Sequence, residues 1–366
     1  MLRPAIGVLL VSILALAPFR SAVADLNTDI AAKCLTGGTV TVPENLTVTS
    51  TINLLCAPGT LPVSLVGIGA PSRIVCNTGA NPCLIVGSTN QTNIRQNLSV
   101  RSLTLIGPGR ATTGSVGVFV RPEAKDSTFT DLQVENFDVG ILMGASTTYL
   151  LEGVTFNNLR IGKALPRGSQ INTAIHMQHL VGNIHVTNFD FAAYHHIIEF
   201  DGNAGIGSGA SFTEGTLNTT WVSGEAAVDV SVADNGHRTL QIEQVQDWET
   251  AVPFVDMGPG VDVTLNAILA TGDPYQTSAY PAFHIAPNSF GALTITNSWL
   301  HAQNSGANLM KLEAPSALLQ ISTSRISGVM NFVAPTIALI SSTYCVNAPT
   351  GNLANFHSSA GLGYCP

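Results

Sequence analysis

Short apolar triplets with a variable centre recur along this sequence, and they hold the residues best suited to acid–base chemistry. Side chains alternate along a strand, so the centre of an apolar–X–apolar triplet faces away from its two neighbours. The centres are Leu142, His176, Glu199, Asp229, Asp256, His284 and Lys311. Imidazole, carboxylate and ammonium groups are the usual participants in proton transfer. The candidate catalytic residues are therefore His176, Glu199, Asp229, Asp256, His284 and Lys311.

The triplets return at a spacing typical of a solenoid. The intervals between consecutive centres are 34, 23, 30, 27, 28 and 27 residues, within the range of repeat architectures. Each triplet follows a longer alternating strand, such as residues 154–159 or 184–189, by about ten residues. We expect every coil to carry one strand of each kind and to stack in parallel on the next coil. An antiparallel β-sandwich, the alternative, would not repeat the same pair of strands in the same order.

Stacking would bring three acids together. Adjacent coils lie about 4.8 Å apart, so Glu199, Asp229 and Asp256 are predicted to form a file of carboxylates on neighbouring coils. Like charges placed directly opposite one another are destabilising. The arrangement therefore indicates either a bound cation or raised pKa values that serve catalysis.

Two chemistries fit this file. Glu199 and Asp256 would be two coils apart, roughly 9.6 Å, a separation suited to an inverting glycosidase in which one carboxyl protonates the leaving group and the other activates water. Alternatively, Glu199, Asp229 and Asp256 would hold Ca²⁺, which prefers several oxygen ligands. The metal would neutralise a uronate while His176, His284 or Lys311 takes part in β-elimination.

Other residues near the triplets have weaker signals. Four aromatic residues precede or follow these strands and are candidates for stacking on sugar rings, with packing against the coils as the alternative: Tyr194, Trp221, Trp248 and Tyr280. Four asparagines are expected to form a stacked ladder at one turn: Asn136, Asn158, Asn188 and Asn297. The spacing His195-His196-x-x-Glu199 resembles a zinc motif, but that motif belongs to helices, and a strand is expected to split these side chains between faces.

The composition agrees with an all-β fold. Only 10% of the residues are charged and 34 are Gly, while the apolar residues come in short bursts separated by Thr, Ser, Asn and Gly. This pattern is typical of many short strands joined by tight turns. The formal net charge of −8 excludes a nucleic-acid partner, because phosphate contacts need clustered cations.

The first residues have the layout of a secretory signal peptide. Arg3 precedes an apolar run over residues 5–17, and Ala22-Val23-Ala24 forms a small-residue cleavage site. The run is too short for a comfortable membrane span, and no later segment offers one. We expect residues 1–24 to be removed and residues 25–366 to form one secreted domain, extracellular or periplasmic, with caps at 25–36 and 337–366.

Six cysteines in an exported chain indicate disulfides. Pairing of sequence neighbours predicts Cys34–Cys56, Cys76–Cys83 and Cys345–Cys365, although other connectivities remain open at this point. Two of these bonds would lie near the ends of the chain, where the core of a solenoid is otherwise open to solvent.

The start of the predicted domain resembles the first coil of the pectate-lyase-like β-helix superfamily. A short helical segment, Leu26 to Lys33, precedes Gly37-Gly38-Thr39-Val40-Thr41-Val42-Pro43 and then Ser64-Leu65-Val66-Gly67-Ile68-Gly69. The resemblance implies a single-stranded right-handed parallel β-helix with a short N-terminal capping helix. It also implies ancestry among proteins that act on or bind polysaccharides, although fold alone does not define an activity.

The motifs of the superfamily's enzymes are incomplete here. The polygalacturonase-like branch carries Asn-Thr-Asp, Asp-Asp, Gly-His-Gly and Arg-Ile-Lys, whereas this chain has Asn172-Thr173-Ala174 and Gly236-His237-Arg238 and lacks the other two. The pectate-lyase branch uses an Arg base, and no Arg is a triplet centre. Two hypotheses follow: a secreted polysaccharide lyase or inverting hydrolase, or a non-catalytic surface β-helix that acts as an adhesin or carbohydrate-binding protein. A polysaccharide is the expected partner in both, and the oligomeric state is left open.

Overall fold

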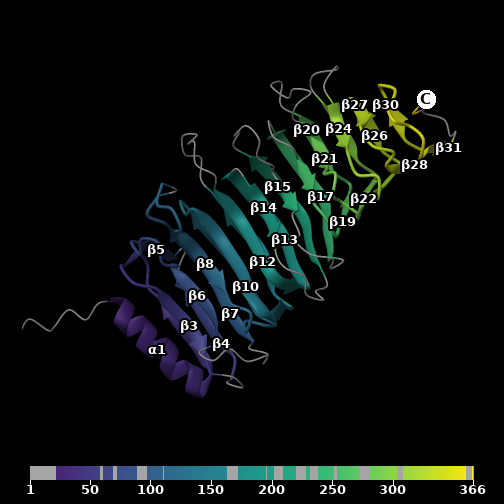
Figure 1. Cartoon of the computed structure of the whole chain (residues 1–366). Coiled ribbons are helices and arrows are strands. Elements are labelled where there is room, and N and C mark those ends of the chain that lie inside the picture. The colour runs from purple at the N-terminus through teal and green to yellow at the C-terminus, as the bar shows by residue number, and fades with distance from the viewer. Residues whose placement is uncertain are drawn as a thin grey trace, which may run out of the picture.

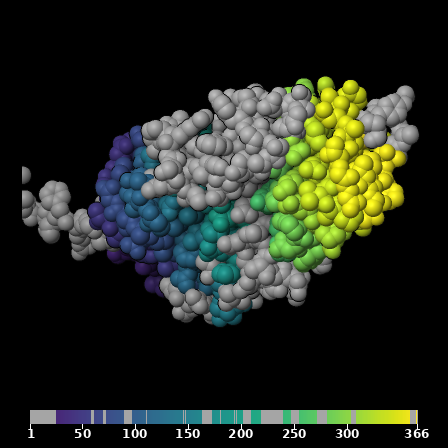
Figure 2. Space-filling model, turned by 45° about the horizontal axis from the view of Figure 1, so that its top comes forward, coloured from purple at the N-terminus to yellow at the C-terminus, as the bar shows by residue number. Residues whose placement is uncertain are grey.

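The chain folds as a right-handed parallel β-helix, in which successive coils stack along one axis (Figure 1). The computed structural model describes residues 22–57, 61–68, 72–88, 97–109, 111–162, 172–194, 196–201, 209–219, 228–230, 238–250, 254–272, 281–302, 308–359 and 365. In the space-filling view of Figure 2, the colours change band by band from the N-terminal to the C-terminal end, because each coil completes a full turn before the next begins. The predicted fold is confirmed.

One face of the helix is a twelve-stranded parallel sheet that contains every triplet. Its strands are β3 (Ile52–Cys56), β6 (Leu84–Ser88), β8 (Val116–Val120), β10 (Val139–Glu152), β12 (Thr173–Gly182), β14 (His196–Asp201), β16 (Val228–Val230), β18 (Val255–Met257), β21 (Phe283–Ile285), β24 (Asn308–Leu312), β27 (Val329–Phe332) and β30 (Thr350–Gly351). We call this sheet the triplet face.

The remaining strands form a nineteen-stranded sheet that is bent along its length, and we call it the bent sheet. Its strands are β1 (Gly38–Val42), β2 (Leu46–Val48), β4 (Val63–Gly67), β5 (Ser72–Cys76), β7 (Leu98–Ile106), β9 (Thr128–Glu135), β11 (Thr155–Ile161), β13 (Ile184–Tyr194), β15 (Ala210–Thr219), β17 (Arg238–Thr250), β19 (Val261–Asn266), β20 (Leu269–Gly272), β22 (Ala292–Thr296), β23 (Trp299–His301), β25 (Leu318–Ser322), β26 (Arg325–Ser327), β28 (Ile337–Ser341), β29 (Tyr344–Cys345) and β31 (Phe356–Ser359).

From β7 onward, one left-handed residue per coil makes the bend of this sheet. Each such residue has a left-handed backbone with φ between 47° and 60°, and the pairing on both sides places it opposite its counterpart in the next coil. A left-handed residue turns the chain sharply without lengthening the turn. These residues, which we call the corner ladder, are Ser102, Asp131, Asn158, Asn188, Glu214, Gln244, Ala267, Asn297, Thr323 and Ser342.

The predicted asparagine ladder is correct for three of its four members. Asn158, Asn188 and Asn297 belong to the corner ladder, but Asn136 lies beyond the end of β9, at a different turn. The partner of Asn158 in the preceding coil is Asp131, whose Oδ1 accepts a hydrogen bond of 2.6 Å from Asn158 Nδ2. The sequence pattern pointed to Asn136, five residues after the true corner residue Asp131, because apolar and polar residues alternate on both sides of the corner in β9.

The core consists of the inward side chains of all coils. Aliphatic residues dominate it, and aromatic rings occupy the middle coils, where Phe129 stacks on Phe156 with ring centroids 4.5 Å apart. Because each inward residue lies on its equivalent in the next coil, the core continues from one end of the molecule to the other.

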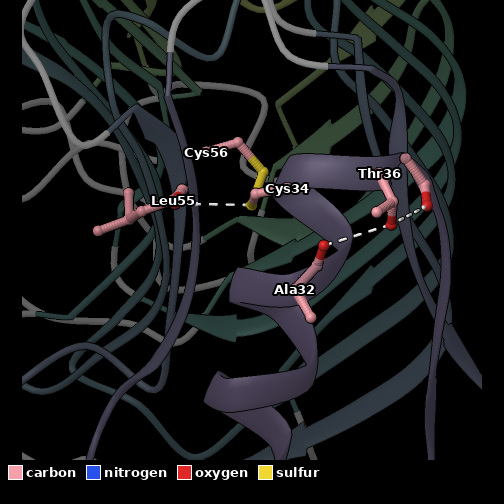
Figure 3. Close-up of a disulfide and its surroundings, with 6 residues drawn as sticks. Ala32, Cys34, Thr36, Leu55 and Cys56 are labelled. Atoms are coloured by element: carbon pink, nitrogen blue, oxygen red, sulfur yellow. Dashed lines mark hydrogen bonds between the residues drawn. A yellow bond between two sulfur atoms is a disulfide. The ribbon is translucent and has the colours of Figure 1, made fainter.

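The N-terminal end of this core is covered by helix α1 (Ala22–Thr36). Leu26, Ile30 and Cys34 lie one turn apart on one side of the helix and are buried. Cys34 forms a disulfide with Cys56 at the end of β3, and the hydroxyl of Thr36 donates to the carbonyl of Ala32 (Figure 3). The capping helix is therefore present, and residues 22–24 form its first turn. The rest of the predicted signal peptide lies outside the described residues.

The other two disulfides also join the expected cysteines, Cys76–Cys83 and Cys345–Cys365. Near the C-terminus, β28 pairs with β25 and β31 pairs with β28. Residues 337–359, expected as a cap, thus continue the stack. Within the described ranges, no helix has the length and apolar character needed to cross a membrane.

Candidate functional site

The triplet centres form a continuous file on the triplet face, which we call the charged column. The strand register pairs His176 with Glu199, Glu199 with Asp229, Asp229 with Asp256, Asp256 with His284, and His284 with Lys311. The residues on both sides of Glu199, Asp256 and His284 are fully buried, while the centres themselves are partly exposed. The predicted superposition of these residues, which are far apart in sequence, is confirmed.

The file continues with uncharged residues toward both ends of the molecule. Leu142 lies opposite His176, and it is preceded by Phe119, Ile85 and Asn53. Beyond Lys311 the next centre is Asn331. The charged column therefore occupies the C-terminal half of a longer strip, whose N-terminal half is mostly apolar and partly exposed.

Glu199 is surrounded by two imidazoles and a hydroxyl. Its Oε1 lies 3.6 Å from Nε2 of His176, its Oε2 lies 3.6 Å from Nδ1 of His196, and Oε2 accepts a 2.9 Å hydrogen bond from the hydroxyl of Thr173. The Nε2 atom of His176 also lies 3.3 Å from the amide nitrogen Nε2 of Gln178. The carboxyl is thus held from three sides.

These neighbours determine the charge of Glu199. Burial raises the pKa of the carboxyl, but the adjacent imidazole of His196, the charge of His176 and the hydroxyl of Thr173 together outweigh burial, so that its pKa is lowered. Glu199 is therefore ionised near neutral pH. The expectation of a raised pKa is wrong for this residue, because the imidazoles of His196 and His176 and the hydroxyl of Thr173 surround the carboxylate.

The position of His196 corrects a second expectation. A regular strand would place His196 and Glu199 on opposite faces, since they are three residues apart. Ile197 and Ile198 are both buried, however, so the alternation is interrupted between them. This irregularity brings His196 back to the side of Glu199. The sequence named His196 only in a zinc-like spacing that was set aside and did not make Thr173 a candidate; the paired starts of β12 and β14 bring both residues to Glu199.

His284 is the centre of a second cluster. Its Nδ1 lies 3.0 Å from Oδ1 of Asp256, and its Nε2 lies 2.7 Å from Oε2 of Glu313. Lys311 Nζ lies 2.9 Å from the other oxygen of Glu313. The hydrogen bond with Asp256 raises the pKa of His284; burial opposes the shift, and Glu313 adds to it. A carboxylate on each ring nitrogen stabilises the imidazolium form.

Glu313 was missed by the sequence analysis, although a signal was present. It follows Lys311 by two residues, and residues two apart on a strand face the same side. Burial raises the pKa of Glu313, but hydrogen bonds from Lys311 and His284 outweigh it, so the pKa is lowered. In the second cluster, Glu313, whose pKa is lowered, therefore lies beside His284, whose pKa is raised.

The predicted aromatic residues do not form one sugar-binding surface. The assignment of Tyr194 is wrong, because its side chain is fully buried and its hydroxyl donates a 3.1 Å hydrogen bond to the carbonyl of Phe137. A ring enclosed in the core cannot stack on a ligand. Trp248 belongs to β17, but its side chain is outside the described part of the structure, as are Trp221 and Tyr280.

A metal site also receives no support from the described residues, among which no group of three or more His, Cys, Asp and Glu side chains has an arrangement that could hold a metal ion. Asp229 is placed in the charged column by its backbone register alone. The proposed Ca²⁺ ligand set, Glu199, Asp229 and Asp256, therefore remains a prediction.

The fold is shared with several solved structures, although no protein-family profile and no curated protein sequence matches the chain. The enzymatically active domain of tailspike protein 2 from bacteriophage CBA120 superimposes with a TM-score of 0.57 at 12% identity, covering 86% of this chain and 48% of that domain. The A-module of mannuronan C-5 epimerase AlgE4 from Azotobacter vinelandii gives a TM-score of 0.53 at 15% identity. The match covers 92% of this chain and 95% of the A-module. A third structure, DFA-IIIase from Arthrobacter chlorophenolicus A6, gives a TM-score of 0.50 at 10% identity. The match covers 93% of this chain and 82% of DFA-IIIase.

These likenesses establish the architecture alone. This chain spans about half of the tailspike domain it matches and 39% of the full-length tailspike protein 2. At such low identities, the residues of the charged column have to be interpreted from their own geometry.

Proposed function

We propose that this chain is a secreted enzyme that binds a polysaccharide along the triplet face and hydrolyses it at the charged column. The observation that carries this proposal is the file itself, in which partly exposed titratable side chains are held on successive coils between fully buried neighbours. A strip of this kind fixes the spacing of its groups along one line, which suits an extended polymer better than a compact ligand.

The surroundings of the charged column support a carbohydrate. The apolar half of the strip, Leu142, Phe119 and Ile85, offers partly exposed surface next to the acids, as sugar rings require. Two of the structural neighbours have names that refer to a polysaccharide-modifying enzyme and to an enzymatically active tailspike domain. Their shared fold makes a polysaccharide the first ligand class to test.

The proposed reaction uses Glu199 as the base and the Asp256–His284 pair as the acid. Ionised Glu199 accepts a proton from water, and the water oxygen forms the new bond to the anomeric carbon. The glycosidic C–O bond breaks, and the leaving oxygen takes the proton shared between Asp256 and His284. The backbones of Glu199 and Asp256 are two coils apart, roughly 9.6 Å, which is close to the upper limit of about 9.5 Å between the carboxyl groups of inverting enzymes.

The other residues have supporting roles. His176, His196 and Thr173 position the carboxylate of Glu199, and Glu313 with Lys311 orients His284. Asp229 lies between the two catalytic groups in the register. A carboxylate at this place in the file would stabilise the positive charge that develops on the sugar in the transition state.

The test is a panel of acidic and neutral polysaccharides in which reducing ends and absorbance near 235 nm are measured together. We expect reducing ends without absorbance, and Glu199→Gln or Asp256→Asn should lower the rate by about 10²- to 10⁴-fold. Glu243→Gln, on the bent sheet, is the matched control and should retain full activity.

Three outcomes would contradict parts of the proposal. Unchanged turnover by Glu199→Gln would remove that residue from the site. Absorbance near 235 nm would replace hydrolysis with β-elimination. Binding of a polysaccharide without cleavage by the wild type would favour the carbohydrate-binding or adhesin alternative.

Export is part of the same proposal. Three disulfides with no free cysteine among the described residues are typical of proteins that fold in an oxidising compartment. Together with the N-terminal pattern of residues 1–24, they support an extracellular or periplasmic protein in which residues 25–366 form one domain. Mass spectrometry of the exported protein would test this by locating its first residue.

A further inference from the structure

An exposed aromatic–arginine–aromatic stack lies on the bent sheet, near the C-terminal end. Trp299 of β23, Arg325 of β26 and Tyr344 of β29 are direct partners on three successive coils. The guanidinium carbon of Arg325 lies 5.1 Å from the centroid of the Trp299 ring and 5.8 Å from that of Tyr344. We call these residues the Trp–Arg–Tyr ladder.

The exposure of the ladder is unusual for residues of this size. Trp299 retains 47% and Tyr344 49% of its surface in contact with solvent, and Arg325 is exposed as well. The same column carries small or uncharged side chains on the two preceding coils, Gln246 and Leu269. Among the described residues of this column, aromatic rings are present only at Trp299 and Tyr344.

The stack prepares the guanidinium for a planar anion. The two rings hold the faces of the guanidinium by cation–π contact, which restricts a side chain that is otherwise flexible. Its N–H groups lie in the plane of the guanidinium, where they match the geometry of a carboxylate. A side chain that is already ordered loses less entropy when a ligand binds.

The charge distribution along the chain favours an anionic ligand at the Trp–Arg–Tyr ladder. The protein is acidic overall, with a formal charge of −8, yet Glu313 is the last Asp or Glu in the sequence. Glu313 belongs to the triplet face, where it binds His284 and Lys311. Among the described residues no carboxylate forms an ion pair with Arg325, so its charge is available to a ligand.

Polar groups lie beside the ladder on the same coils. His301 and Ser327 are paired two residues beyond Trp299 and Arg325, so they face the same side and are partly exposed. An imidazole and a hydroxyl next to aromatic rings provide hydrogen-bonding partners for sugar hydroxyls. A surface with apolar rings, one fixed cation and neutral polar groups fits a saccharide better than an apolar protein partner.

We propose that the Trp–Arg–Tyr ladder binds a carboxylate-bearing saccharide, such as a uronate unit of a polysaccharide. The site is separate from the charged column, since it lies on the bent sheet, and it does not depend on whether the chain is an enzyme. Arg325 pairs with the carboxylate, and Trp299 and Tyr344 contact the neighbouring sugar surface.

The test is affinity electrophoresis in gels that contain polygalacturonate, alginate or a neutral β-glucan. All proteins carry Glu199→Gln, so that cleavage at the charged column does not interfere. At low ionic strength, Arg325→Met should weaken retardation by the matching polyuronate about tenfold and leave the neutral glucan result unchanged. Arg325→Lys, which keeps the charge but lacks the planar fork, should recover only part of the binding.

Arg73→Met is the matched control. Arg73 is exposed on β5 of the bent sheet. It pairs with Thr104 and so begins, at the N-terminal end, the column of residues to which the Trp–Arg–Tyr ladder belongs. It makes the same change in net charge, and retardation should stay at the Glu199→Gln level. Equal losses in both Met variants would reduce the effect to net charge and overturn the proposal.

Further measurements separate the site from other roles of the ladder. Unchanged retardation of Arg325→Met together with a lower melting temperature would show that the stack only stabilises the coils. A change from dimer to monomer in sedimentation velocity, without any effect on retardation, would assign the surface to a second copy of the chain. With Glu199 intact, Arg325→Met should hydrolyse a short oligosaccharide at the wild-type rate. Failure of the proposed hydrolysis at the charged column can therefore be distinguished from failure of the proposed binding at the Trp–Arg–Tyr ladder.

Discussion

Asp256 and His284 lie directly opposite one another on consecutive coils, with 3.0 Å between Oδ1 of the carboxylate and Nδ1 of the imidazole. Because Glu313 contacts the other ring nitrogen, His284 links two carboxylates of the triplet face, of which Glu313 also pairs with Lys311. The imidazole thus places a positively charged partner beside Asp256, at the end of the run of acids Glu199, Asp229 and Asp256 in the charged column, where like charges would otherwise only repel one another.

The first prediction concerns stability. The pKa of His284 is raised from its ordinary value of 6.5, so its stabilising contribution is fully present below about pH 6.5 and is lost as the pH rises through the folded pKa. We expect His284→Gln to lower stability by about 1 kcal/mol near pH 6 and by less near pH 9. Thermal melting at both pH values measures the difference.

His357→Gln provides the control for that measurement. His357 is exposed on β31, and the described residues place no carboxylate in an ion pair with it. Its replacement should change the melting temperature little and equally at both pH values. A larger loss for His284→Gln at high pH than at low pH would contradict the ion-pair assignment.

The second prediction concerns the pH dependence of catalysis. The pKa of Glu199 is lowered from 4.5, so a base of this kind remains ionised until the pH falls below that value. The acid limb of the kcat/KM profile should therefore lie below pH 4.5. Thr173→Val removes the hydroxyl that donates to Glu199 and should move the limb to higher pH.

Folding stability provides a readout of Glu199 that does not require turnover. A lowered pKa contributes stability that is present above the unfolded value of 4.5 and is lost as the pH falls through the folded pKa. Glu199→Gln should therefore lose more stability near pH 6 than near pH 3. An equal loss at both pH values would mean that the imidazoles do not stabilise the ionised carboxylate.

The third prediction follows from the buried position of Tyr194. Tyr194→Phe removes the hydrogen bond to the carbonyl of Phe137 and should destabilise the protein by about 1–2 kcal/mol, since it leaves a buried acceptor unpaired. Retardation in polysaccharide gels should not change. Weaker retardation at an unchanged melting temperature would instead support the sugar-binding role expected from the sequence.

The fate of Tyr194 illustrates what the sequence can and cannot establish. Period-two alternation identified the triplet strands, and the register of the column from Leu142 to Lys311 follows from their order. Regular alternation after the buried Phe191 would point Tyr194 outward, but the strand register shifts between Ala192 and Tyr194, and the sequence pattern does not reveal this shift.

Contacts that depend on irregular backbone were likewise out of reach. His196 approaches Glu199 only because the alternation is interrupted at Ile197 and Ile198, and Asn136 was misplaced because two strands of one coil look alike. Glu313, by contrast, could have been found, since it lies two residues from Lys311. Side-chain contacts therefore cannot be predicted from the sequence pattern where a strand departs from regular alternation.

The fourth prediction concerns the corner ladder. Ala267 has a φ of 53°, a left-handed conformation that costs an L-residue with a Cβ about 1–2 kcal/mol. Ala267→Gly should therefore stabilise the protein by about 0.5–1 kcal/mol, because relief of this strain exceeds the added freedom of the unfolded chain. Chemical denaturation measures the change.

Ala292→Gly is the matched substitution on a strand. Ala292 begins β22, one coil away, and its backbone is not left-handed. Glycine there should destabilise the protein by about 0.5–1 kcal/mol. If both substitutions changed the stability in the same direction, the corner would not be strained.

The one-residue corner has a consequence for how such a protein can diversify. Its width is constant from Ser102 to Ser342, although the repeat length varies from 23 to 34 residues between triplet centres. All variation in length must therefore fall at the other bends, beside the strip where ligands are expected. Loops bordering that strip can lengthen or shorten without disturbing the stack of coils. New ligand specificities can therefore arise while the corner ladder stays unchanged.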